Sequence, residues 1–355
     1  MENKSPPLTR DQRQQLGVSK WIKSGCRASL VWCTGSGKSR TAILAIKAFL
    51  TKNQNKKIVV IVPTENLKVQ WMQELNKFSL FYEVSVEVIN SAVKKDDQID
   101  LVILDECHRY GSDTFYAIFS KRVPKLVLGL SATFNRLDGR HKLLEKYCPV
   151  CDVLSVKEAL DNGWLSPYRE YKVLIDPTNI DEYREANAQF IESFSIFDFN
   201  FETAMNCLKN IIYRRAYAKK IGISAKDMDA ITFTWNRTLK ARKAFVMEHP
   251  IKLEITRKIL ANRPNSKAIT FSATKKQAEK IGGGYVVHSG KTKKKNQITI
   301  SEFSRLKTGV IHTAKSLDEG ADVPGLNLAI ILSNTSSQTQ KTQRVGLSRW
   351  PTINS

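Results

Sequence analysis

Residues 34–39 read Thr-Gly-Ser-Gly-Lys-Ser, a glycine loop that ends in a lysine and a hydroxyl. Backbone N–H groups in such a loop surround phosphate oxygens, and the positive end of a following helix dipole adds to the attraction. Lys38 is placed to reach the β- and γ-phosphates of a nucleotide, and the Ser39 hydroxyl is placed to bind Mg²⁺. The predicted phosphate-binding residues are Thr34, Gly35, Ser36, Gly37, Lys38, Ser39 and Arg40.

The match to a phosphate loop is partial, because the full pattern has a glycine where this chain has Trp32. An ordinary glycine turn is the alternative. The flanking residues favour the phosphate loop, since residues 28–33 form an apolar run typical of a buried strand and residues 38–50 follow with a helical pattern.

Asp105 and Glu106 end a second apolar run, residues 99–105. A buried strand of this kind carries Asp105 to Mg²⁺, and Glu106 can orient or deprotonate the water that attacks the γ-phosphate in line. A solvated acidic turn is the alternative, but five apolar residues do not normally precede one. We therefore predict Lys38, Asp105 and Glu106 as catalytic residues, with Ser39 and Asp105 as the Mg²⁺ ligands.

Apolar runs that alternate with helical patterns predict the strands that carry these residues. The run at residues 57–63 is continuous, as in a central parallel strand. Polar residues follow the C-terminal ends of the runs, where an open parallel sheet has its binding site. The strands predicted in the first part of the chain are residues 28–33, 57–63, 84–89, 99–105 and 125–130.

A second set of strand patterns follows a helical region. Residues 171–175, Tyr-Lys-Val-Leu-Ile, are predicted as a strand, and residues 180–262 then read as helices rich in aromatic and basic residues. The later predicted strands are residues 267–271, 285–288, 309–313 and 326–332. The expected fold class is α/β, with two doubly wound parallel-sheet domains and a helical insertion in the second.

The chain of 355 residues suits two domains, since each is then large enough for its own core. Gly163 and Pro167 indicate a junction between them. We expect a nucleotide-binding domain at residues 1–160 and the second sheet domain at residues 263–355. Residues 161–262 would hold the junction, the first strand of the second domain and the helical insertion.

The formal net charge of +22 indicates a polyanionic partner, most simply nucleic acid. A Lys-rich source proteome is the alternative. No apolar run approaches the roughly 20 residues of a membrane span, and the N-terminus lacks the apolar core of a signal peptide. We expect a cytoplasmic protein with no membrane partner, and the Lys- and Asn-rich composition fits a phage or an AT-rich bacterium.

The six cysteines do not make a disulfide framework in so long a chain, so we expect reduced thiols. Cys148 and Cys151 form a lone C-x-x-C without two further zinc ligands at suitable spacing. Packing is the expected role of this pair.

The motifs together resemble superfamily 2 of the helicases and translocases, which are built from two RecA-like domains. Residues 105–108, Asp-Glu-Cys-His, are similar to the family's D-E-x-H box, and residues 34–39 match its first motif, which often lacks the leading glycine. Residues 63–71 are similar to the motif whose Pro-Thr step contacts the nucleic-acid backbone, and residues 313–324 to the fifth motif. The motifs follow the family's order along most of the chain.

The resemblance implies further roles. Gln12 would read adenine, although a helix-capping box with Thr9 is the alternative role for this side chain. Gly320 and Asp322 would face the nucleotide. Coupling of hydrolysis to strand movement would fall to His108, Ser131 and Thr133. Contacts with the nucleic-acid backbone would come from Pro63, Thr64, Gln70, Ser272 and Thr313.

The sixth motif begins at Gln343 and then departs from the family. The family's last two arginines, which neutralise the γ-phosphate, correspond here to Leu347 and Trp350. Arg349 lies one residue early, so on a helix it points about 100° away from the expected face. We retain Gln343 and Arg349 as catalytic candidates. Because the chain stops at Ser355, we expect an altered or truncated C-terminus.

The helical region mixes basic residues, such as Arg214, Arg237 and Arg242, with Trp235. Contact with nucleic acid is one interpretation of this mixture. Packing of the aromatic rings in a core is the other.

The expected function is an ATP-dependent motor on DNA. ATP would bind between two RecA-like domains, with Mg²⁺ as cofactor, and hydrolysis would move the strand bound across both. We expect a monomer on single- or double-stranded DNA, and RNA stays open because the expected contacts are to the backbone.

Two other functions are compatible with parts of the sequence. An ATP-gated nucleic-acid clamp with weak or no turnover is motivated by Leu347 and Trp350, since an arginine finger accelerates hydrolysis roughly 10³–10⁵-fold. A small-molecule kinase or other phosphate-loop enzyme explains the first domain alone.

Overall fold

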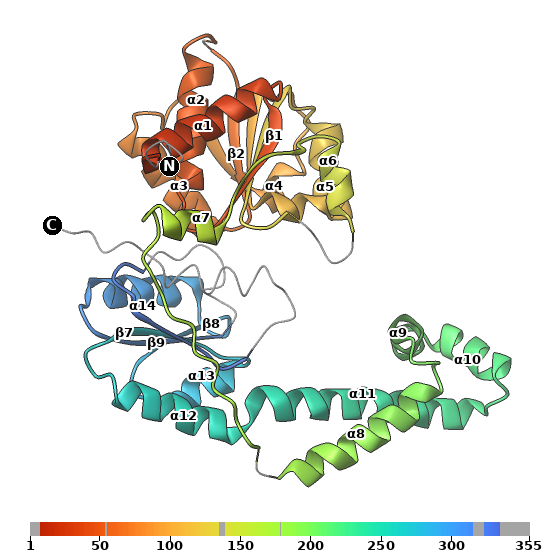
Figure 1. Cartoon of the computed structure of the whole chain (residues 1–355). Coiled ribbons are helices and arrows are strands. Elements are labelled where there is room, and N and C mark those ends of the chain that lie inside the picture. The colour runs from red at the N-terminus through yellow and green to blue at the C-terminus, as the bar shows by residue number, and fades with distance from the viewer. Residues whose placement is uncertain (1–7, 54, 135–138, 178, 315–322, 334–355) are drawn as a thin grey trace, which may run out of the picture.

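The computed structural model of the chain describes residues 8–53, 55–134, 139–177, 179–314 and 323–333 (Figure 1). It contains two parallel β-sheets, one from each half of the chain, and a set of helices that lies between them in the sequence. The predicted α/β fold with two parallel-sheet domains is therefore confirmed.

The first sheet has six strands in the order β3-β2-β4-β5-β1-β6, and every neighbouring pair is parallel. Continuous apolar runs suit strands covered on both faces, and all residues of β2 and β4 are buried. Its strands are β1 (Arg27–Trp32), β2 (Ile58–Val62), β3 (Val84–Val88), β4 (Leu101–Asp105), β5 (Leu126–Ser131) and β6 (Val150–Leu154). Its helices are α1 (Arg10–Lys23), α2 (Lys38–Leu50), α3 (Glu65–Lys77), α4 (Ile89–Ala92), α5 (Asp113–Lys121), α6 (His141–Glu145) and α7 (Val156–Asp161), with a 3₁₀ helix at Cys107–Gly111.

Strand β6 is an element that the apolar patterns did not predict, because Asp152 interrupts it. The Asp152 carboxylate is buried and receives hydrogen bonds from Arg13 Nη1 at 2.6 Å, Lys20 Nζ at 2.5 Å and Trp32 Nε1 at 2.9 Å. A buried carboxylate is tolerated only when such donors satisfy it. The donors come from α1 and β1, so this cluster fixes α1 against the edge of the sheet.

The second sheet has four parallel strands in the order β10-β7-β9-β8. Its strands are β7 (Lys267–Phe271), β8 (Tyr285–His288), β9 (Gly309–Ala314) and β10 (Leu328–Ile331). The helices that accompany it are α12 (Pro250–Ala261), α13 (Lys275–Ile281) and α14 (Lys293–Arg305). Among the described helices, none has both the length and the apolar character that a membrane crossing requires.

The predicted strand at residues 171–175 is wrong. Residues 166–177 have no regular secondary structure, and the side chains of Tyr171 and Leu174 are 73% and 95% exposed. The apolar and β-branched residues suit a strand, but a strand also needs a neighbouring edge that pairs with its N–H and C=O groups. The segment instead runs as the connection from α7 to α8 (Figure 1).

Four helices form an arm that projects away from both sheets (Figure 1). They are α8 (Ile180–Ser195), α9 (Phe201–Lys209), α10 (Ile211–Lys220) and α11 (Ala225–Glu248). The arm has its own apolar core around Phe197, Met228 and Trp235, all fully buried. Each sheet has a separate core as well, and the domain limits at residues 160 and 262 stay predictions.

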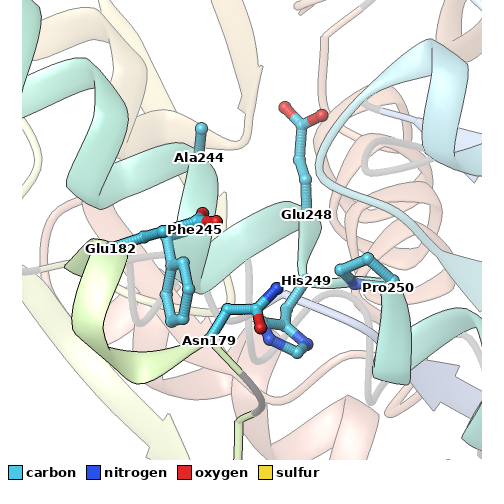
Figure 2. A pocket seen from close by; sticks show the side chains of 7 residues that line it. All are labelled: Asn179, Glu182, Ala244, Phe245, Glu248, His249 and Pro250. Carbon is cyan, nitrogen blue, oxygen red and sulfur yellow. The ribbon is translucent and has the colours of Figure 1, made fainter.

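A pocket of about 210 Å³ lies at the base of the arm, between the start of α8 and the junction of α11 with α12 (Figure 2). His249 ends α11 and caps α12, and the ring of Phe245 packs edge-on against it. Binding sites for drug-sized ligands usually have about 300–1,000 Å³. The lining residues are Asn179, Glu182, Ala244, Phe245, Glu248, His249 and Pro250. We therefore interpret this pocket as a packing gap where the arm meets α12 and not as a ligand site.

A buried ion network fixes the far edge of the first sheet. The Arg122 side chain is completely buried, and its guanidinium donates to Glu87 Oε2 at 2.6 Å and to both carboxylate oxygens of Asp97. Hydrogen bonds from Arg122 lower the pKa of Asp97 to about 2. Glu87 lies in β3, so the network joins this edge strand to the end of α5.

We predict that Arg122→Met destabilises the first sheet domain by about 3–5 kcal/mol, because it takes the buried guanidinium from the Glu87 carboxylate, which then keeps only Lys95 Nζ, at 2.8 Å. Lys121→Met removes an exposed neighbour and is the matched control. Urea denaturation followed by tryptophan fluorescence measures the difference. In the parent, the ion pair of Asp97 contributes fully to the free energy of unfolding above the ordinary pKa of 3.8. This contribution is lost as the pH falls toward 2. Equal loss of stability in the two variants would contradict this assignment.

Candidate active site

The predicted phosphate loop lies between β1 and α2, at the C-terminal edge of the first sheet. Gly35 and Gly37 have φ values of +82° and +95°, in the left-handed region that favours glycine. A Cβ on Gly37 would lie 2.2 Å from Nε2 of Gln14, so neither conformation nor space permits a side chain there. Lys38 Nζ donates to the carbonyl oxygen of Trp32 at 3.1 Å. This hydrogen bond would have to break for the lysine to contact a phosphate.

The departure at Trp32 has a structural cause. Trp32 is the last residue of β1, and its indole is fully buried under α1. Gly17 of α1 makes room for it, because a Cβ on Gly17 would lie 2.5 Å from the indole, and the Arg13 guanidinium lies 4.8 Å from its ring centroid. The position therefore belongs to the packing of α1 on β1, and the two glycines that the loop needs follow it.

Asp105 ends β4, and Glu106 follows it with a left-handed φ of 49°. The Asp105 carboxylate is buried and accepts a hydrogen bond from Trp71 Nε1 at 2.8 Å. Burial and the charge of Glu106 raise the pKa of Asp105 to about 6, against the opposing effects of Trp71 and Lys38. The two acids and Lys38 thus act on one another at the same edge of the sheet, since β5 alone separates β4 from β1.

The predicted coupling residues lie together. Nδ1 of His108 lies 2.9 Å from Oγ of Ser131 and 3.4 Å from Oε2 of Glu106. Ser131 Oγ is also 3.4 Å from that carboxylate oxygen and accepts the N–H of Thr133 at 3.2 Å. Adjacent strands β4 and β5 deliver these groups, which joins the candidate catalytic acid to the segment after β5.

The predicted nucleic-acid contacts fall into two groups. Pro63 and Thr64 follow β2, and the Thr64 hydroxyl caps α3, on which Gln70 lies. In the second sheet, Ser272 follows β7 and donates its N–H to the carbonyl of Thr313 at 2.8 Å. Both groups lie where strands end, but Pro63, Ser272 and Thr313 are buried in the described structure. Their contact with nucleic acid stays a prediction.

Gln12 forms the capping box at the start of α1, in which its Oε1 accepts the N–H of Thr9 at 2.8 Å. Its role toward adenine is untested by this geometry. The remaining predicted site residues, Gly320, Asp322, Gln343 and Arg349, lie outside the described residues.

The sequence patterns missed two residues that contact the phosphate loop, Arg10 and Gln14. Arg10 Nη2 donates to the carbonyl of Gly35 at 2.5 Å, and Gln14 Nε2 lies 3.5 Å from the carbonyl oxygen of Ser36. Gln14 is 1% exposed, and its Oε1 is a buried acceptor that has no hydrogen-bond donor among the described residues. Their spacing of four residues puts them on one face of α1, which is the signal that could have identified them.

Two family descriptions match the chain. Residues 9–136 match the res subunit of type III restriction enzymes, and residues 251–347 match the helicase conserved C-terminal domain.

Relatives resemble the chain over different lengths. The DNA 3'-5' translocase XPB2 of Sulfurisphaera tokodaii is 25% identical over 372 residues, which cover 96% of this chain and 79% of the relative. A candidate ATP-dependent RNA helicase of African swine fever virus, QP509L, is 36% identical over 136 residues, 31% of this chain and 26% of the viral protein.

Solved structures share the fold. The helicase domain of Pyrococcus furiosus Hef has a TM-score of 0.54 and 16% identity, with 95% of this chain and 92% of that one covered. The DNA-bound type ISP restriction-modification enzyme LlaBIII has a TM-score of 0.57 and 14% identity, with 98% of this chain but 27% of that one covered.

We predict that Gln14→Ala raises the Kd for ATP about tenfold, because one lost hydrogen bond and an emptied contact with the loop cost about 1–1.5 kcal/mol. Gln15→Ala is the matched control, since Gln15 is the exposed neighbour on the same helix. Titration with a fluorescent ATP analogue measures both, and Gln14→Glu tests whether shape alone suffices. Parental affinity in Gln14→Ala would show that α1 does not support the loop.

Proposed function

The chain belongs to superfamily 2 of the helicases and translocases, and on this premise we propose that it moves along DNA by hydrolysing ATP between its two parallel-sheet domains. Its activity is that of an ATP-dependent nucleic-acid motor, and it is therefore an ATP hydrolase. The observation that carries the proposed mechanism is the convergence of the phosphate loop with Asp105 and Glu106 at one edge of the first sheet.

ATP binding is assigned to the loop and α1. Lys38 would exchange the carbonyl oxygens of Trp32 and Cys33 for the β- and γ-phosphates, while the loop N–H groups surround the phosphate oxygens. Gly320, Asp322 and Gln12 would complete the nucleotide site.

Mg²⁺ fits the oxygen donors of this edge. Asp105 is a buried carboxylate whose pKa stands near 6, and a divalent cation compensates such a charge. We propose Ser39 and Asp105 as the protein ligands, because Mg²⁺ prefers oxygen ligands and is usually bound by one or two carboxylates with the substrate phosphates. When bound, the ion neutralises charge on the phosphates during transfer.

Glu106 is the proposed base that orients and deprotonates the attacking water. Its contacts with His108 and Ser131 give hydrolysis a route to the segment that ends at Thr133. Gln343 and Arg349 are proposed to reach the γ-phosphate from the second domain.

The proposed track crosses the C-terminal edges of both sheets. Pro63, Thr64 and Gln70 would hold it on the first domain, and Ser272 and Thr313 on the second. The side chains of Asn66 in α3 and Gln297 in α14 meet at 3.1 Å, so the two domains approach each other beside Thr64. Closing and opening at this approach would move the bound strand.

DNA is proposed as the track because of the coverage of the relatives. The relative that covers 96% of this chain is named a DNA translocase, whereas the match to an RNA helicase covers 31%. The net charge of +22 suits either polyanion. We also propose a monomer.

We predict that DNA accelerates ATP turnover by the full chain and that RNA does so less. Glu106→Gln should lower turnover about 10²–10⁴-fold while ATP binding persists, because the base is lost and the loop is intact. Phosphate release with each nucleic acid measures this. The control is Glu83→Gln, an exposed carboxylate before β3 at the opposite edge of the sheet. Normal ATP binding without stimulation by either nucleic acid would refute the motor.

A second candidate is an ATP-gated clamp with slow turnover. It rests on Leu347 and Trp350, which stand where the family has arginines. If this is correct, Leu347→Arg combined with Trp350→Arg should raise turnover by roughly 10³-fold or more. Brisk hydrolysis by the parent, with no gain in the double variant, would eliminate the clamp.

A further inference from the structure

The basic and aromatic residues of the arm divide into an interior set and a surface set. Trp235 is fully buried, Arg214 is buried against Asp229 at 2.6 Å, and the Arg242 guanidinium lies 4.0 Å from the centroid of the Phe190 ring. These side chains stabilise the arm. They are not available to a partner.

The surface set carries a high charge. Residues 209–243 contain ten Lys and Arg against two Asp, a formal charge of +8 out of +22 for the whole chain, and eight of the ten, all except Arg214 and Arg242, are exposed. Of the two carboxylates, Asp229 pairs with Arg214 and Arg215, and Asp227 accepts the hydroxyl of Ser224. The exposed Lys and Arg side chains that these two carboxylates do not pair with face solvent.

Three of these cations form one row along α11. Lys226, Arg237 and Lys240 are exposed, and their spacing puts them within about 60° of one another around the helix axis. Trp235 and Met228 occupy the opposite, buried face. We call Lys226, Arg237 and Lys240 the basic row. Lys226 and Lys240 form no ion pair within the described part of the chain.

The surroundings of the basic row suit a long polyanion. The row extends over about 21 Å, the axial rise of about six base pairs. Between its members, Ala230 and Phe233 are exposed on the same side of the helix. Asp229 lies beside the row and is paired with Arg214 and Arg215. The arm projects away from both sheets, so the row lies apart from the proposed track (Figure 1).

We propose that the basic row of α11 binds the phosphate backbone of the nucleic acid as a second contact, separate from the track across the two sheets. The inference rests on the proposed function, since it concerns the same nucleic acid. A second contact on an arm of this kind holds the protein on its substrate while the contacts of the sheets are released in each cycle.

The test is a triple variant, Lys226→Gln with Arg237→Gln and Lys240→Gln, in the full chain. Glutamine removes the charge and remains a good helix former. Binding to a duplex and to a single strand of equal length is measured by fluorescence anisotropy at several salt concentrations, without ATP. We expect affinity to fall roughly tenfold or more, and the slope of log K against log salt to shrink by about 2.7 for duplex or about 2 for single strand.

The matched control is Lys23→Gln with Lys52→Gln and Lys94→Gln. These three exposed lysines precede strands β1, β2 and β4, so they lie at the edge opposite the track, and the change in net charge is the same. ATP turnover without nucleic acid should be unchanged in both triple variants, which shows that both have folded.

Affinity and slope equal to those of the control triple would overturn the role of the arm. If the parent is nevertheless stimulated by DNA, the motor stands and only this inference fails. If the parent binds neither nucleic acid, both fail.

Discussion

The carbonyl groups of the phosphate loop need hydrogen-bond donors. The positions of those donors determine how α1 packs in the first domain. A loop whose N–H groups point at a phosphate turns its carbonyls outward. Here Lys38 lies on the carbonyls of Trp32 and Cys33, and Arg10 donates to those of Gly35 and Ser36. Arg10 can do so only if α1 lies along β1. The buried Trp32 indole and the Asp152 cluster hold it there.

The need for a hydrogen-bond donor also links Asp105 to the predicted nucleic-acid contacts that follow β2. Asp105 is buried and would be costly without a partner. Its donor is Trp71 Nε1, on the helix that Thr64 caps. Movement of α3 would therefore change the hydrogen bond that Asp105 accepts from Trp71. This is a physical connection between proposed track and proposed Mg²⁺ ligand that does not pass through Ser131.

The sequence was informative wherever a local pattern was sufficient. Apolar patterns identified nine of the strands found in both sheets. The run at β2 is continuous because a strand covered on both faces tolerates little else. Strand β6 was missed because Asp152 is satisfied by residues more than a hundred positions away. Residues 171–175 were assigned wrongly because an apolar pattern does not show whether a neighbouring strand is available to pair with it. Gln14 was overlooked for a third reason. Its contact with the phosphate loop depends on where α1 packs, and no sequence motif encodes that position.

The arm shows where composition ceases to be informative. Its basic and aromatic residues suggested nucleic acid or core packing. Core packing is confirmed for Trp235 and Arg214, and contact with nucleic acid stays a proposal for the exposed cations. The position of a residue around the α11 axis separates the two sets, since one side packs into the core of the arm and the side about 180° away is exposed. Trp235 and Met228 fall on the inner side, and Lys226, Arg237 and Lys240 on the outer one. The apolar core that holds the arm together includes none of these three cations, and Arg237 donates to Gln189 of α8 at 3.4 Å. Because most of the row's charge faces solvent, a polyanion is the partner that it fits.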